Sequence, residues 1–194
     1  MEKVAIPPGF KITPAQFERL ASYEQEARLE LTASGELIIM SPTGGSAGKK
    51  NFRLIQQLGN WIDQDKTGIG FDSSTVFVLP NGARKSPDAS WIKLERWNQL
   101  TPKQQDGFPP IVPDFVIDLV SPSDLKNQRY EDLQAKMQEY IDNGVKLGWL
   151  IEPKSKKVEI YRSGQDPEII ENPQNVSGED ILLGFVLDLT NIFN

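Results

Sequence analysis

The apolar residues of this chain fall into short runs separated by turn residues, and into segments with helical spacing. In the strongest run, residues 115–120, five of the six residues are apolar and a Ser-Pro pair follows. Such a run predicts a strand buried on both faces of a sheet. Asp118 lies within it. Because an unpaired buried carboxylate costs several kcal/mol or takes up a proton, Asp118 is expected to have a cation, a hydrogen-bond network or a raised pKa.

Two helices are predicted in the first third of the chain. A capping-box signature at residues 13–16 predicts a helix that runs to about Glu26. A Gly-rich loop precedes the second helix, which is expected over residues 49–65. The apolar stripe of this second helix consists of Phe52, Ile55, Leu58 and Trp61 or Ile62.

A third helix is predicted over residues 127–143, with Gly144 in the position after its end. Lys136 lies at the edge of its apolar stripe. A lysine there either extends outward to water or directs its ammonium group into a pocket, and its place on the helix by itself favours water. The stripe consists of Leu133, Met137, Tyr140 and Ile141.

Alternating runs predict several further strands. Glu30 lies between two leucines of a predicted hairpin, where alternation directs it away from them and favours exposure to solvent over a role in a site. Asp88 follows a proline, and a turn residue is the simpler interpretation. A loop is expected over residues 99–113, and apolar packing over residues 181–193. The strands are predicted at residues 29–31, 36–40, 70–79, 86–92, 145–151 and 158–161.

Composition removes several classes of chemistry. The sequence has 194 residues, of which 38% are hydrophobic, so one domain spanning residues 1–194 is expected. It contains no cysteine and no histidine, which excludes disulfides, thiolate zinc sites and Ser-His-Asp triads. Carboxylate, lysine, tyrosine and hydroxyl chemistry remains, together with oxygen-preferring metals such as Mg²⁺ or Mn²⁺.

The charge and the hydropathy limit the partners. With 21 basic and 27 acidic residues the net charge is −6, so any contact with nucleic acid must use a local basic patch. No apolar run approaches the roughly 20 residues that span a bilayer, and the first nine residues lack the apolar core of a signal peptide. A soluble cytoplasmic protein that does not bind membranes is expected.

One set of residues points to a reaction. Asp88 and Asp118 are 30 residues apart on predicted strands, and Lys136 follows on a helix. Metal-dependent hydrolysis of phosphodiesters could use two carboxylates to hold Mg²⁺ and a lysine to orient or activate water. By spacing alone many domains of this size would contain such a trio. Two acid-x-Lys sequences, at residues 124–126 and 152–154, lie outside a buried strand, and Asp114 is explained by a turn.

The sequence also resembles a known family through an ordered set of motifs: residues 28–31 and 35–37, 86–88, 113–123, Lys136 with Tyr140, 144–145 and 148–153. It is similar to the Uma-two family of bacterial restriction endonucleases, within the PD-(D/E)XK nuclease superfamily. The resemblance covers most of the chain. It implies an α/β fold with a restriction-endonuclease-like mixed β-sheet core flanked by helices, with an N-terminal helix and β-hairpin, in a single PD-(D/E)XK nuclease-like domain.

The resemblance also implies roles for individual residues. Asp88 matches the aspartate of the PD motif, and Asp118 matches the second acidic position, where the family more often has glutamate. Both would bind Mg²⁺ or Mn²⁺. Val120 stands where the superfamily usually places its lysine, so Lys136 would take that role from the following helix. Glu30 matches a further acidic position and would support the metal or position water.

The function predicted in this way is metal-dependent hydrolysis of DNA. Lys49, Lys50 and Arg53, at the start of the second helix, are candidate phosphate contacts because cations oppose the helix dipole there, although a solvated face is the simpler interpretation. A homodimer would suit the cutting of both strands of a duplex. An alternative is a catalytically inactive nuclease-fold module for binding or assembly, because relatives commonly carry a histidine near residues 49–51 and this chain has none. A glycosidase with paired carboxylates is a third class, but no aromatic platform for a sugar is evident.

Overall fold

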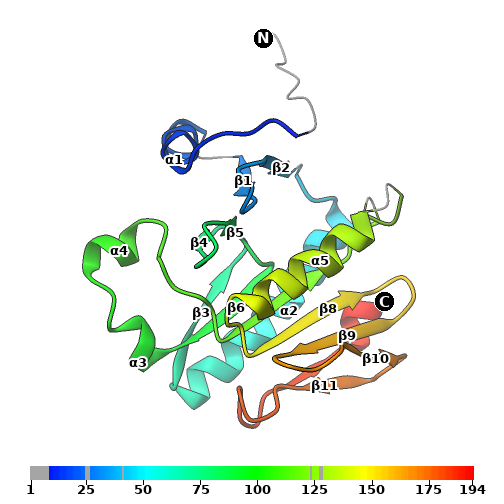
Figure 1. The fold of residues 1–194 in the computed structure, drawn as a ribbon. Coiled ribbons are helices and arrows are strands. Elements are labelled where there is room, and N and C mark those ends of the chain that lie inside the picture. Colours follow the sequence, from blue (N-terminus) through cyan, green and yellow to red (C-terminus); the bar gives the residue numbers. More distant parts are fainter. Residues whose placement is uncertain (1–8, 25–26, 41, 123, 127–128) are drawn as a thin grey trace.

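The computed structural model describes residues 9–24, 27–40, 42–122, 124–126 and 129–194, and its centre is a six-stranded sheet (Figure 1). The strand order is β10-β9-β8-β7-β6-β3. β7 and β8 are parallel and the other neighbours are antiparallel, so the sheet is mixed. The strands are β3 (Gly68–Asp72), β6 (Ala89–Lys93), β7 (Phe115–Leu119), β8 (Leu147–Glu152), β9 (Lys157–Arg162) and β10 (Glu168–Glu171).

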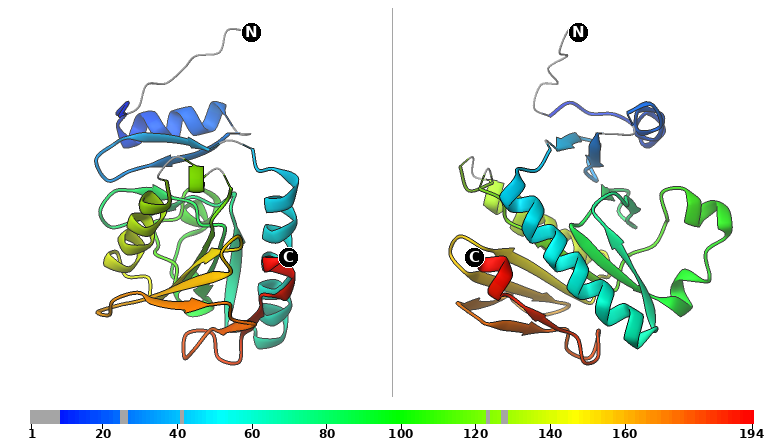
Figure 2. Two further views of the ribbon diagram at one scale, coloured as in Figure 1. Left: turned by 90° about the vertical axis from the view of Figure 1, so that its right-hand side faces the viewer. Right: turned by 180° about the vertical axis from the view of Figure 1, so that it is seen from behind.

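Helices cover both faces of this large sheet, as the left view of Figure 2 shows. α5 (Arg129–Asp142) covers one face and makes the crossover that the parallel pair β7 and β8 requires. Met137 and Tyr140 of α5 pack with Val116 and Leu150 there. α2 (Gly45–Asp65) covers the other face. The C-terminal segment packs on the same face as α2, through β11 (Asn175–Ser177), β12 (Val186–Asp188) and α6 (Thr190–Phe193).

A second, four-stranded sheet lies at one end of the large sheet (Figures 1 and 2). Its order is β2-β1-β5-β4, and α1 (Pro14–Tyr23) packs on it through Phe17. The chain passes from β5 directly into β6 of the large sheet, so residues 86–88 join the two sheets. The strands of this small sheet are β1 (Arg28–Leu31), β2 (Leu37–Met40), β4 (Phe77–Val78) and β5 (Arg84–Lys85).

These observations confirm the expected fold: a mixed sheet flanked by helices, with an N-terminal helix and a β-hairpin. The capping box at Thr13 is present, and so are the buried strand at residues 115–119 and the hairpin of β8 and β9. Gly144 follows α5 with a positive φ of 110°, as expected for the residue after a helix. Most apolar residues of 181–193 pack into the core, whereas Leu183 and Val186 are exposed.

Other predictions were wrong in detail. α2 begins at Gly45, and Phe52 is 66% exposed, because the face that packs on the sheet is centred on Leu54 and Leu58. The strand predicted over residues 70–79 is two strands: β3 pairs with β6, and a turn sends β4 to the small sheet. Residues 99–113 are not all loop, because Thr101 caps the short helix α4 (Pro102–Asp106). α3 (Leu94–Trp97) and the 3₁₀ helix η1 (Asp124–Lys126) are also short.

Some predicted features lie outside the described residues. These are residues 1–8, residues 25–26, Ser123 and the start of the third helix at residues 127–128. The first helix was predicted to run to about Glu26, but α1 ends at Tyr23 with Glu24 as its C-cap. Among the described residues, no helix combines the length and the apolar character that crossing a membrane would need.

Candidate active site

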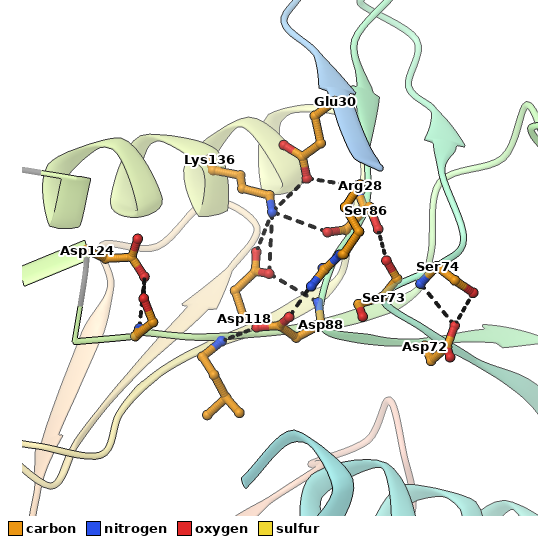
Figure 3. A network of polar contacts seen from close by, with 12 residues as sticks. Arg28, Glu30, Asp72, Ser73, Ser74, Ser86, Asp88, Asp118, Asp124 and Lys136 are labelled. Carbon is orange, nitrogen blue, oxygen red and sulfur yellow. Dashed lines mark hydrogen bonds and ion pairs between the residues drawn. The ribbon is translucent and has the colours of Figure 1, made fainter. Parts of the chain in front are cut away.

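Asp88 and Asp118 are neighbours at the end of the large sheet. β6 and β7 are antiparallel with Ala89 opposite Ile117, so the residue before β6 lies beside the end of β7. The backbone N–H of Asp88 donates to Oδ1 of Asp118 at 3.2 Å. In return the N–H of Leu119 donates to Oδ2 of Asp88 at 2.9 Å. These two hydrogen bonds fix both carboxylates at the point where the two sheets meet (Figure 3).

Lys136 of α5 points toward the same place. Its ammonium nitrogen lies 3.2 Å from Oδ2 of Asp118 and 2.9 Å from Oε1 of Glu30 (Figure 3). Only 11% of its side chain is exposed. The expectation that Lys136 extends to water was therefore wrong, because the helix face that carries it packs on the end of the sheet beside two carboxylates.

Glu30 approaches from the small sheet and is only 2% exposed. Alternation on β1 does direct it away from Leu29 and Leu31, as predicted. That side of β1 faces the large sheet instead of water, so the prediction of a solvent-exposed residue was wrong. The N–H of Ser86 donates to Oε1 of Glu30 at 2.9 Å, and the ammonium nitrogen of Lys85 lies 3.9 Å from Oε2.

Two cations of this site were not predicted from the sequence. Nη2 of Arg28 lies 3.5 Å from Oδ1 of Asp88, and Lys85 pairs with Glu139 of α5 at 3.0 Å. Arg28 could have been found, since residues two apart on a strand share a face and Glu30 was already a candidate. Lys85 gave no such signal, because its partners depend on how β1 and β5 pair.

Burial has the largest effect on the protonation of Asp118. Burial raises the pKa of Asp118 to about 7, Lys136 opposes that rise, and the charges of Asp88 and Glu30 add to it. Burial lowers the pKa of Lys136, but Asp118 and Glu30 outweigh it and raise that pKa well above the usual value. The ammonium group therefore stays charged at neutral pH.

Two buried oxygens of the site make no hydrogen bond to the residues that the structure describes: Oδ2 of Asp118 and the hydroxyl of Tyr140. The first has the ion pair with Lys136, whose nitrogen also lies 5.7 Å from the centroid of the Tyr140 ring. Burial raises the pKa of Tyr140 well above its usual value, so its hydroxyl stays protonated. A buried polar atom without a hydrogen bond costs about 1–3 kcal/mol, which a bound ion or water would offset.

Comparison with known proteins places the chain in a family. The model of the Uma2 family, described as "Putative restriction endonuclease", matches residues 14–190. The chain belongs to the Uma2 family. Its fold is similar to that of a "putative nuclease belonging to DUF820" from Anabaena variabilis ATCC 29413, with a TM-score of 0.70 and 19% identity over 85% of this chain and 89% of the other. No curated protein matches the sequence.

The donors of this Uma2 site fit an oxygen-preferring metal. In the described part of the chain, no three acidic side chains converge into a metal cluster. Mg²⁺, however, is commonly held by one or two carboxylates, with waters and substrate phosphates completing its shell. Asp88 and Asp118 supply two carboxylates side by side, and Oδ2 of Asp118 accepts no hydrogen bond from the described residues, although it pairs with Lys136.

The predicted phosphate contacts of the Uma2 chain lie on α2, which covers the face of the large sheet opposite to α5 (Figure 2). The ammonium group of Lys50 donates to the carbonyl of Ile192 at 2.6 Å, which ties α2 to the C-terminal helix. Arg53 donates to its neighbour Gln56 at 2.8 Å, and Lys49 is exposed. Contact of these three residues with DNA stays a prediction.

Asp114 is not the turn residue that was predicted. It is 1% exposed, and its carboxylate lies 2.7 Å from both Arg96 and Lys146. Burial raises its pKa, but the hydrogen bonds from Lys146, Lys93 and Arg96 lower the pKa by more than burial raises it. The pKa of Asp114 is therefore below its usual value. Asp114 anchors the start of β7, at the opposite end from Asp118.

Asp124 behaves as expected for a residue outside the site. Its carboxylate accepts a hydrogen bond from the backbone N–H of Ser121 at 2.8 Å. It therefore shapes the loop that follows β7.

Proposed function

We propose that this Uma2 family member is a metal-dependent endonuclease that hydrolyses DNA phosphodiester bonds with Mg²⁺ or Mn²⁺. The observation that supports this most is the convergence of Asp88, Asp118, Glu30 and Lys136, which come from β1, β7, α5 and the segment before β6. The description of the family supports a nuclease-type function.

Asp88 and Asp118 would hold the metal. A divalent cation at this position supplies a Lewis acid for the phosphate and lowers the pKa of a bound water. The oxygen atoms closest to this position are Oδ1 of Asp88, now 3.5 Å from Arg28, and Oδ2 of Asp118, now 3.2 Å from the ammonium nitrogen of Lys136. Both face the junction of the two sheets (Figure 3).

Lys136 would orient the attacking water and stabilise negative charge on the phosphate. Because its pKa is raised, Lys136 stays protonated at neutral pH and cannot act as the base that takes a proton from water. Glu30 holds this ammonium group at 2.9 Å and is itself held by the N–H of Ser86. We therefore assign Glu30 the role of positioning Lys136.

Calorimetric titration with Mn²⁺ tests the metal site without a choice of DNA sequence. The wild type should bind Mn²⁺, and Asp118→Asn should lose at least tenfold in affinity while it keeps the fold by circular dichroism. Asp106→Asn, at the exposed end of α4, is the matched control and should bind as the wild type does. A folded wild type that binds no Mn²⁺, with or without duplex DNA, would contradict the proposal.

The second candidate is an inactive nuclease-fold module that binds DNA or another protein. It is favoured by the pairing of Asp118 with Lys136 and of Asp88 with Arg28, which offsets part of the carboxylate charge without a metal. Incubation of supercoiled DNA with Mg²⁺ or Mn²⁺ separates the two. Nicking that depends on the metal and on Asp118 supports the enzyme, whereas specific binding without nicking supports the module.

A homodimer remains part of the proposal. Sedimentation at several protein concentrations would test it. A monomer at the concentration where the chain cuts both strands would contradict it.

A further inference from the structure

A cavity of about 200 Å³ lies beside the candidate active site, between β1 and the turn after β3. Its polar lining consists of Arg28, Ser73, Ser74 and Ser86, and three apolar residues complete the wall. We call it the Arg28 pocket. A volume of this size is below the roughly 300–1,000 Å³ of a site for a drug-sized ligand. It equals about six or seven waters at roughly 30 Å³ each, which leaves room for one phosphate group.

Arg28 has hydrogen-bond donors that no described residue accepts. Its guanidinium carries five N–H groups, yet its ion pair with Asp88 is long, at 3.5 Å. Its buried Nε makes no hydrogen bond to any residue that the structure describes. Arg28 shares a face of β1 with Glu30, so it points toward the carboxylates, and 29% of its side chain is exposed. A planar fork with unused donors, partly open to solvent, is suited to a phosphate group.

The serines give the pocket a fixed shape. The hydroxyl of Ser86 donates to the carbonyl of Ser73 at 2.6 Å, which ties the segment before Asp88 to the turn after β3 (Figure 3). The N–H and the hydroxyl of Ser74 donate to Asp72 at 3.0 and 2.6 Å. The hydroxyl of Ser73 makes no such hydrogen bond within the described residues, so it remains available to a ligand.

We propose that the Arg28 pocket binds a phosphodiester group of the DNA backbone next to the one that is cleaved, with Arg28 moving from Asp88 to that phosphate. This inference rests on the proposed function for its ligand, DNA, and for the neighbouring phosphate that is cleaved. It assigns Arg28 two partners in turn: the carboxylate of Asp88 in the free protein and the phosphate in the complex. Because Arg28 and a metal ion both approach Oδ1 of Asp88, they compete for it, and removal of the guanidinium favours the metal.

The test measures binding of a short fluorescent DNA duplex to the whole chain by anisotropy, in EDTA so that no cleavage occurs. Arg28→Gln should weaken binding about tenfold and reduce the salt slope by about one. Arg28→Lys keeps the positive charge but loses the planar guanidinium group, so its DNA affinity should lie between those of the wild type and Arg28→Gln. Lys103→Gln, at an exposed position of α4, removes one positive charge elsewhere and should change the affinity less than twofold.

A second measurement excludes a folding defect. Mn²⁺ titration of Arg28→Gln should show metal binding at least as tight as in the wild type, which a misfolded site would not retain. An unchanged DNA affinity in Arg28→Gln, a loss equal to that of Lys103→Gln, or a wild type that does not bind the duplex would each overturn the pocket. The two proposals can fail separately. DNA binding that depends on Arg28, without cleavage, contradicts the proposed nuclease activity but leaves Arg28 as a phosphate contact. Cleavage by the wild type together with normal DNA binding by Arg28→Gln contradicts only the proposed role of the Arg28 pocket.

Discussion

Replacing Lys136 with methionine should destabilise the protein by about 3–5 kcal/mol. Methionine keeps most of the length of the side chain and removes the charge. The lost partners lie at 2.9 Å in Glu30 and 3.2 Å in Asp118, and both carboxylates are nearly inaccessible to water. Breaking a buried ion pair by removing one partner costs about 3–5 kcal/mol. At about 2–4 °C for each kcal/mol in a chain of this size, the melting temperature should fall by about 6–20 °C.

The loss should grow with pH. The pKa of Asp118 is about 7 in the folded protein, above its usual 3.8, so the folded state binds the proton more tightly. The stability contributed by this group therefore falls as pH rises through about 7. Without the ammonium of Lys136 the folded pKa rises further, and each unit of rise adds about 1.4 kcal/mol to the loss above that pH.

Urea denaturation of wild type and Lys136→Met in EDTA, at about pH 6 and about pH 8.5, measures both effects. Lys93→Met is the matched control, because the ion pair of Lys93 with Glu95 is 3.7 Å long and exposed. This replacement should cost less than about 1 kcal/mol of stability. A loss in Lys136→Met no larger than that of the control would refute the buried ion pair. A loss that shrinks as pH rises would refute the assignment of Asp118.

Two further predictions concern stability. Glu159 accepts hydrogen bonds from two tyrosines, and its pKa is lowered because these and other bonds outweigh burial. The stability that the Glu159 carboxylate contributes is present above about pH 4.5 and is lost as pH falls. Glu159→Gln should therefore cost about 3 kcal/mol at neutral pH and less in acid. Urea denaturation at neutral and at acidic pH measures both losses. Gly68→Ala should destabilise by about 2 kcal/mol or more because its Cβ would overlap the Trp91 ring, whereas Gly59→Ala meets nothing within 4 Å and should stabilise α2 by about 0.5–1 kcal/mol; melting temperatures compare the pair.

Sequence determined the features that depend on neighbours along the chain. The capping box at Thr13, the strand at residues 115–119, the turn at Gly35 and the helix that carries Lys136 all follow from local spacing. The need of Asp118 for a cation, a hydrogen-bond network or a raised pKa was also predictable, since a carboxylate in a buried strand must be compensated.

Tertiary structure decided which groups meet. Alternation gives the direction of Glu30, but only the packing of the small sheet on the large one makes that side the interior. The edge position of Lys136 on its helix allows either water or a pocket, and the crossover from β7 to β8 brings it to Asp118. Arg28, on β1, reaches Asp88 because the small sheet packs on the large one. The free energy of an ion pair depends on distance and burial, and for residues far apart in the chain both are set by the packing of whole elements.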